Sequence, residues 1–150
     1  MIREATPYDA TQVAPLFLLG MGHIAGIFAD SENYDDAIPF FEDFINQYSY
    51  QNTLVFIEGD EIKGSITGYD GALLSTLRQP VLDRIREKQP DFVPEDETQA
   101  GEYYLDCINV APGHQGKGIG KKLILAFCER AKSQGHHNVG LIVDFGNPTA

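Results

Sequence analysis

The residues best suited to binding an anion lie in one short segment, "QGKGIGKK" from Gln115 to Lys122, which holds three glycines and three lysines. Glycine has no Cβ, so it permits positive φ angles and lets a ligand approach the backbone closely. If a helix follows such a loop, the free N–H groups of its first turn and its dipole favour a phosphate group. The segment therefore predicts a phosphate-binding loop.

The charge distribution points to the same place. The chain of 150 residues has a net charge of -11. Residues 113–150 hold only 2 of the 22 acidic residues but 5 of the 11 basic ones, so this part alone is net positive. The acidic remainder would repel nucleic acid and anionic membrane, and we expect neither as a partner.

Composition is that of an ordinary globular protein, with 43% hydrophobic and 22% charged residues. We expect one domain over residues 1–150. No apolar run approaches the length of a membrane span, and "MIREATPYDA" has no signal-peptide pattern, so a cytoplasmic protein is expected. Cys107 and Cys128 have no metal-ligand spacing. We expect no metal site, and both cysteines reduced and buried.

Hydrophobic periodicity places the loop between a strand over 102–110 and a helix over 119–131 that ends near Gly135. A Gly59-Asp60 turn predicts a hairpin over 53–69. The remaining predicted elements are strands over 1–5 and 138–145 and helices over 10–18, 37–48 and 74–85, the last restarted at Pro80. The order β-α-α-β-β-(α)-β-α-β predicts a mixed α/β fold.

Two common phosphate-binding loops fit poorly. The nucleotide P-loop requires G-x-x-x-x-G-K-[ST], but Gly118 follows Lys117, and Ala111 stands where the first glycine belongs. The dinucleotide fingerprint requires G-x-G-x-x-G in an early βαβ unit, whereas these glycines are spaced G-x-G-x-G and no parallel repeat precedes them.

The stretch "INVAPGHQGKGIGKKLI" instead resembles the GNAT acetyltransferase superfamily. The family motif is an apolar strand, V-x-P, and then [QR]-x-x-G-x-[GA]; here Val110 and Pro112 precede Gln115, Gly118 and Gly120. The resemblance implies a three-layer α-β-α GNAT fold. It also implies that the family's C-terminal helix and last strands, with the tyrosine that serves as general acid, would lie beyond Ala150.

The same resemblance implies acetyl-CoA as co-substrate. Its pyrophosphate would lie on the loop, and its pantetheine arm would pair with the backbone of Ile108 and Val110. Asn147 matches the start of the family's next helix, where it would contact the pantetheine arm or order the end of the strand; an ordinary helix cap before Pro148 is the alternative. The implied loop residues are Gln115, Gly116, Lys117, Gly118, Gly120 and Lys121.

Acetyl transfer in this family is a direct attack by an amine on a thioester, and a carboxylate can accept the amine proton. Alternation along the strand would place Glu102, Tyr104, Asp106, Ile108 and Val110 on one face, although a β-bulge would swap the faces. Glu102 lies thirteen residues before Gln115, where the resemblance implies a catalytic glutamate of histone-type members. Asp106 lies closer to the loop. Glu102 is the favoured candidate and Asp106 the second, with solvated or ion-paired charges as the alternative.

These observations predict an N-acetyltransferase that acts on a primary amine of a small molecule or peptide within a ternary complex. The alternative is a GNAT-fold module that binds acyl-CoA without catalysis. Whether the protein is a monomer or a homodimer stays open.

Overall fold

The computed structural model of the 150-residue chain describes residues 1–19, 38–42, 46–94 and 98–141. Five strands form one sheet in the order β1-β2-β3-β4-β5, antiparallel except for the parallel pair β4–β5. The strands are β1 (Ile2–Glu4), β2 (Thr53–Glu58), β3 (Glu61–Asp70), β4 (Tyr103–Val110) and β5 (Val139–Gly140). The α-helices are α1 (Ala10–Leu19), α3 (Ile38–Glu42), α4 (Leu74–Arg86) and α5 (Ile119–Ser133), with short 3₁₀ helices η1 (Pro7–Asp9), η3 (Tyr50–Asn52) and η4 (Gly71–Leu73). The mixed α/β fold is confirmed.

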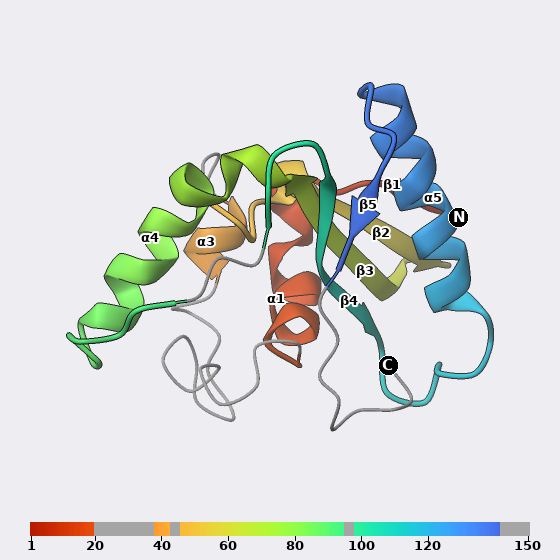
Figure 1. Cartoon of the computed structure of the whole chain (residues 1–150). Helices are drawn as coiled ribbons and strands as arrows, with labels where there is room; N and C mark the ends of the chain where they lie inside the picture. The colour runs from red at the N-terminus through yellow and green to blue at the C-terminus, as the bar shows by residue number, and fades with distance from the viewer. Residues whose placement is uncertain (20–37, 43–45, 95–97, 142–150) are drawn as a thin grey trace.

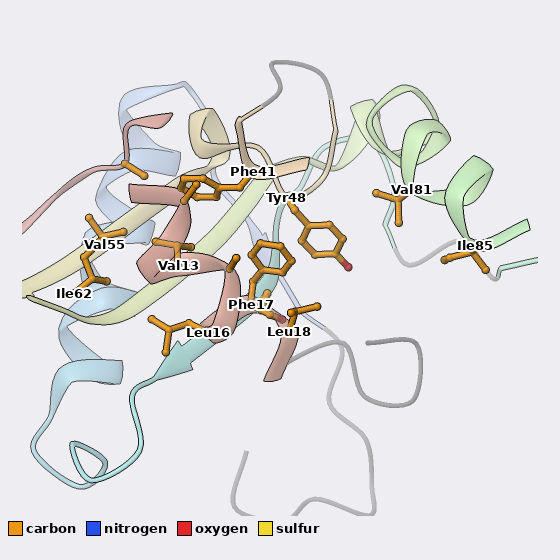
Figure 2. Close-up of a cluster of buried hydrophobic side chains, with 14 residues drawn as sticks. Val13, Leu16, Phe17, Leu18, Phe41, Tyr48, Val55, Ile62, Val81 and Ile85 are labelled. Carbon is orange, nitrogen blue, oxygen red and sulfur yellow. The ribbon is translucent and has the colours of Figure 1, made fainter. Parts of the chain in front are cut away.

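Two hydrophobic clusters on opposite faces of the sheet make three layers. Successive strand residues point to opposite faces, and on β2 Val55 packs with α1 and α3 whereas Leu54 packs with α5. In the α1 cluster, shown in Figure 2, Phe17 stacks on Tyr48 with ring centroids 5.3 Å apart. Figure 1 shows α5 and α4 on opposite sides of the molecule. The predicted α-β-α layering is confirmed.

The outer face of α5 remains exposed and carries Cys128. The expectation that both cysteines are buried is therefore wrong for Cys128, because only every third or fourth residue of α5 faces the sheet. Cys107 is buried as expected.

The hairpin predicted at Gly59 joins β2 to β3, and Gly59 has a φ of 65°, in the left-handed region that favours glycine. Thr6 precedes η1, and its N–H donates to the carboxylate of Asp9 at 2.8 Å, as in a capping box. These local patterns translate directly into structure.

The helix predicted over 37–48 is wrong in its extent. α3 is described as far as Glu42, residues 43–45 lie outside the described ones, and Asn46 to Tyr48 form a bend and turn. Asn46 explains the turn, because its amide donates to Phe40 O at 2.6 Å and accepts from Tyr48 N at 2.8 Å. Such side-chain bonds compete with the helical backbone pattern.

The restart predicted at Pro80 is also wrong, since α4 runs through it without interruption. Proline removes one helical donor. Buried Leu77, Val81, Leu82 and Ile85 along one face of α4 outweigh that loss by packing against the rest of the domain.

Candidate functional site

The glycine loop connects β4 to α5 through two successive turns. His114 N donates to Ala111 O at 3.0 Å, which closes the first turn. Gly113, Gly116 and Gly118 have φ angles of 83°, 81° and 81°. Gly118 is the N-cap of α5, and the space around a Cβ at Gly116 or Gly118 is empty to 4 Å. The loop therefore needs glycine for its backbone path and leaves its outer surface open.

The backbone N–H groups of residues 115–121 are available to a ligand. None of them donates a hydrogen bond to another residue in the described part of the chain. The first amide of α5 with an acceptor is that of Lys122, which bonds to Gly118 O at 3.1 Å. Residues 115–118 are exposed. Unpaired amides at the start of a 15-residue helix form an environment that suits a phosphate group.

The three lysines have different surroundings. Lys122 Nζ lies over the ring of Phe56, 5.8 Å from its centroid, and so contacts β2 rather than the loop. Lys117 and Lys121 are exposed on and beside the loop. Two of the three lysines are therefore placed to act on an anion there.

Beyond Tyr104, one edge of β4, here called the open edge, has no strand partner among the described residues. Among the described residues, β5 pairs with β4 only at Tyr103 and Tyr104. Ala111 N donates to Lys63 O at 2.8 Å, toward β3. Backbone groups of alternate residues point to opposite edges of a strand, so those of Ile108 and Val110 point away from β3, toward the open edge.

A bulge in β4 overturns the predicted alternation. Thr67 of β3 pairs with Cys107 and Gly68 with Leu105, which leaves Asp106 as the extra residue. Ile108 therefore packs toward α5 together with Leu105, whereas Cys107 packs in the α1 cluster on the other face. The expectation that Asp106 shares a face with Ile108 and Val110 is wrong, because the extra residue at the bulge places Asp106 on the opposite face of the sheet.

Asp106 takes part in a hydrogen-bonded group on the α1 side of the sheet. Its Oδ2 accepts from the Tyr69 hydroxyl at 2.8 Å and from Gln47 Nε2 at 3.3 Å. Gln47 Nε2 also donates to the Tyr69 hydroxyl at 3.0 Å. Burial, reinforced by the charge of Asp106, raises the pKa of Tyr69, so its hydroxyl remains protonated.

Glu102 lies just before β4, at the end of the strand farther from the glycine loop. Its Oε1 accepts from Gln99 N at 3.1 Å, and its carboxylate lies against Gly140 of β5. Here β4 and β5 are hydrogen-bonded to each other. The structure thus places Glu102 beside the described β4–β5 pairing and Asp106 beyond the last described pair of these strands.

The remaining expectations for the site concern Asn147, a metal site and the neighbours of Asp106. Asn147 lies outside the described residues. The described part of the chain contains no group of three or more metal-ligating side chains. Sequence reasoning missed Gln47 and Tyr69, which contact Asp106 from 59 and 37 residues away. A bulge opposite Gly68 would have had to be predicted first, because the bulge places Asp106 on the face where Gln47 and Tyr69 lie.

The described helices include none that is long and apolar enough to span a membrane. A search among curated proteins finds no match. Several solved structures are similar to this one. One, described as an acetyltransferase, is 30% identical with a TM-score of 0.81, and the match covers 99% of this chain and 82% of that chain.

Two further structures share the fold at lower identity. An N-acetyltransferase from Staphylococcus aureus Mu50 is 24% identical with a TM-score of 0.79, over 98% of this chain and 83% of that one. A GNAT family acetyltransferase from Brucella melitensis, solved in complex with acetyl-CoA, is 20% identical with a TM-score of 0.54, over 97% of this chain and 77% of that one. The sequence model of the Acetyltransferase (GNAT) family matches residues 23–150. The chain therefore belongs to the GNAT family of acetyltransferases.

Proposed function

We propose that this protein transfers the acetyl group of acetyl-CoA to a primary amine of a small molecule or peptide, by direct attack within a ternary complex. The observation that carries the proposal is the row of acceptor-free amides over residues 115–121, continuous with the open edge of β4. A diphosphate fits the free amides, and an extended arm that carries amide groups fits the open edge of β4 beside them. The solved acetyl-CoA complex of a GNAT relative supports the choice of co-substrate.

The loop would hold the pyrophosphate through backbone amides, with added positive charge from Lys117 and Lys121. Ile108 and Val110 would pair with the pantetheine arm through the backbone groups that they direct toward the open edge. Asn147 would contribute from the segment after β5. The residues proposed to hold the pyrophosphate are Gln115, Gly116, Lys117 and Gly118 of the loop and Gly120 and Lys121 of the first turn of α5.

Bound acetyl-CoA supplies the acetyl thioester, and the chain must deal with the proton of the acceptor amine. An amine with a pKa of about 10.4 costs roughly 4–5 kcal/mol to deprotonate at pH 7. Asp106 is our choice of proton acceptor, because it stands at the bulge of β4, beyond the last described pair with β5. Glu102 is the weaker candidate, since it contacts Gly140 beside the described β4–β5 pairing.

Two measurements test the proposal. Calorimetric titration with CoA should show binding of one molecule per chain. Release of free CoA thiol from acetyl-CoA should then depend on an added amine, drawn from a panel of polyamines, aminoglycosides, amino acids and peptides. Binding without amine-dependent thiol release would support a non-catalytic CoA-binding module instead, and absence of binding would refute both functions.

A further inference from the structure

We propose that Tyr69 and Gln47 are positioning residues that hold the Asp106 carboxylate ionised and aimed at the acceptor amine. This inference rests on the proposed function, because it assigns roles around the proton acceptor of that reaction. The two residues come from separate parts of the fold, Tyr69 from β3 and Gln47 from the turn after α3.

The contacts form a closed triangle. The Tyr69 hydroxyl donates to Asp106 Oδ2 at 2.8 Å, and Gln47 Nε2 lies 3.3 Å from the same oxygen and 3.0 Å from the hydroxyl. The backbone fixes Gln47 as well, since its N–H donates to Leu77 O of α4 at 3.1 Å. Asp106 is thus held on one oxygen by donors that are themselves tied to β3 and α4.

Burial makes the donors rigid. Tyr69 is 2% and Gln47 5% exposed, whereas Asp106 is only partly buried. The Tyr69 ring also packs edge-on against Tyr104, with centroids 5.8 Å apart. Two buried hydrogen-bond donors, the Tyr69 hydroxyl and the Gln47 amide, favour the charged form of the more exposed Asp106 carboxylate and limit its rotamers.

Several titratable groups lie around Asp106. Those that the described residues place there include the Tyr69 phenol, the Tyr48 and Tyr104 phenols beside Tyr69, and the Cys107 thiol. Burial raises the pKa of Cys107 to about 12, and that of Tyr69 is raised for the same reason. Neither the Tyr69 phenol nor the Cys107 thiol therefore carries a negative charge at neutral pH.

A purely structural role is the alternative, because buried polar groups need hydrogen-bond partners in any protein. The two roles differ in what Tyr69→Phe does. A structural role predicts a loss of stability with an unchanged pH profile of turnover. A positioning role predicts that the acidic limb of kcat moves to higher pH, since a carboxylate that loses a donor has a raised pKa.

The test measures kcat and KM against pH for the wild type, Tyr69→Phe and Tyr103→Phe. Tyr103 is a matched control, because it is equally buried but its side chain packs with Phe127 on the α5 side of the sheet. We expect Tyr69→Phe to move the acidic limb upward by about one pH unit, which lowers kcat about tenfold at pH values below the limb. The KM for acetyl-CoA should stay within twofold, and Tyr103→Phe should keep the wild-type profile.

Gln47→Leu provides a second variant should Tyr69→Phe fail to fold, and it should move the limb in the same direction. Carboxyl NMR titration of Asp106, assigned with Asp106→Asn, should show the same upward shift without any need for turnover. An unchanged limb and titration in a folded variant, with an active wild type, would overturn the positioning role alone. No turnover of the wild type with any amine would overturn the proposed function, and this role with it.

Discussion

The guanidinium of Arg3 donates two hydrogen bonds to the carboxylate of Asp9, at 2.8 and 2.9 Å. Asp9 also accepts from the Thr6 N–H, so one carboxylate ties β1 to the start of the first helical segment. The Arg3 hydrogen bonds hold the pKa of Asp9 below its ordinary value.

Asp9→Asn should lower the free energy of unfolding at pH 7 by about 1 kcal/mol, a modest figure because Arg3 is partly exposed and solvent screens the pair. A depressed folded pKa means that this stabilisation is complete above the unfolded value near 3.9 and is lost as pH falls through the folded one. Urea unfolding from pH 7 to 3 should therefore show the difference between the wild type and the variant beginning to narrow below about pH 4. Glu4→Gln on the same strand serves as control, and a difference as large at pH 3 as at pH 7 would contradict the assignment.

Gly118→Glu should weaken CoA binding at least about thirtyfold, because a carboxylate in the loop repels the diphosphate and displaces bonds to the amides. Gly113→Glu is the matched control. Gly113 has nearly the same φ and equally open space, but it precedes the row of free amides. Calorimetry should show the control within about threefold of wild type, and equal losses in both variants would remove the loop from the site.

Lys121→Ala should weaken CoA binding about two- to fivefold in 50 mM salt, and the effect should fade in 500 mM salt, where the Debye length is shorter. Lys132→Ala removes the same charge from the last turn of α5, about 16 Å along the helix, and should have little effect. Comparable effects of the two variants would indicate a response to net charge rather than to a local contact.

The sequence predicted the elements whose causes are local. Glycine in the Gly59 turn and in the loop from Gly116 to Gly120, and apolar periodicity along α5, each act within a few residues of the structure that they produce. The motif around Gln115 therefore led to the family, and the family match agrees.

Features that depend on distant contacts were not predicted. The bulge at Asp106 arises from pairing with Gly68 of another strand, and the triangle with Tyr69 joins segments far apart in the sequence. Continuity of α4 through Pro80 likewise reflects packing that outweighs local propensity. Strand alternation failed at the bulge, next to the proposed acetyl-transfer site.

Gly68→Ala should lower the free energy of unfolding by about 1–3 kcal/mol through overpacking. A Cβ at this position would lie 2.3 Å from ring atoms of Phe127 and 2.4 Å from Tyr104 O, and neither backbone nor a buried ring can yield easily. Gly120→Ala is the contrasting control, since its nearest neighbour would be 3.9 Å away and alanine favours a helix. If Gly68→Ala and Gly120→Ala have the same free energy of unfolding in denaturant, then α5 can shift away from the sheet without loss of stability.

Asp106→Asn should reduce kcat at pH 7 by about 10²–10⁴-fold, the usual contribution of a general base. The loss should shrink as pH rises, because below its pKa of about 10.4 the free fraction of the acceptor amine grows tenfold with each pH unit. Glu102→Gln should keep kcat within about twofold, since that carboxylate accepts from Gln99 N and lies against β5. Steady-state rates from pH 6 to 10 decide between them: a large, pH-dependent loss in Glu102→Gln together with an active Asp106→Asn would reverse the assignment and place proton acceptance beside the described β4–β5 pairing.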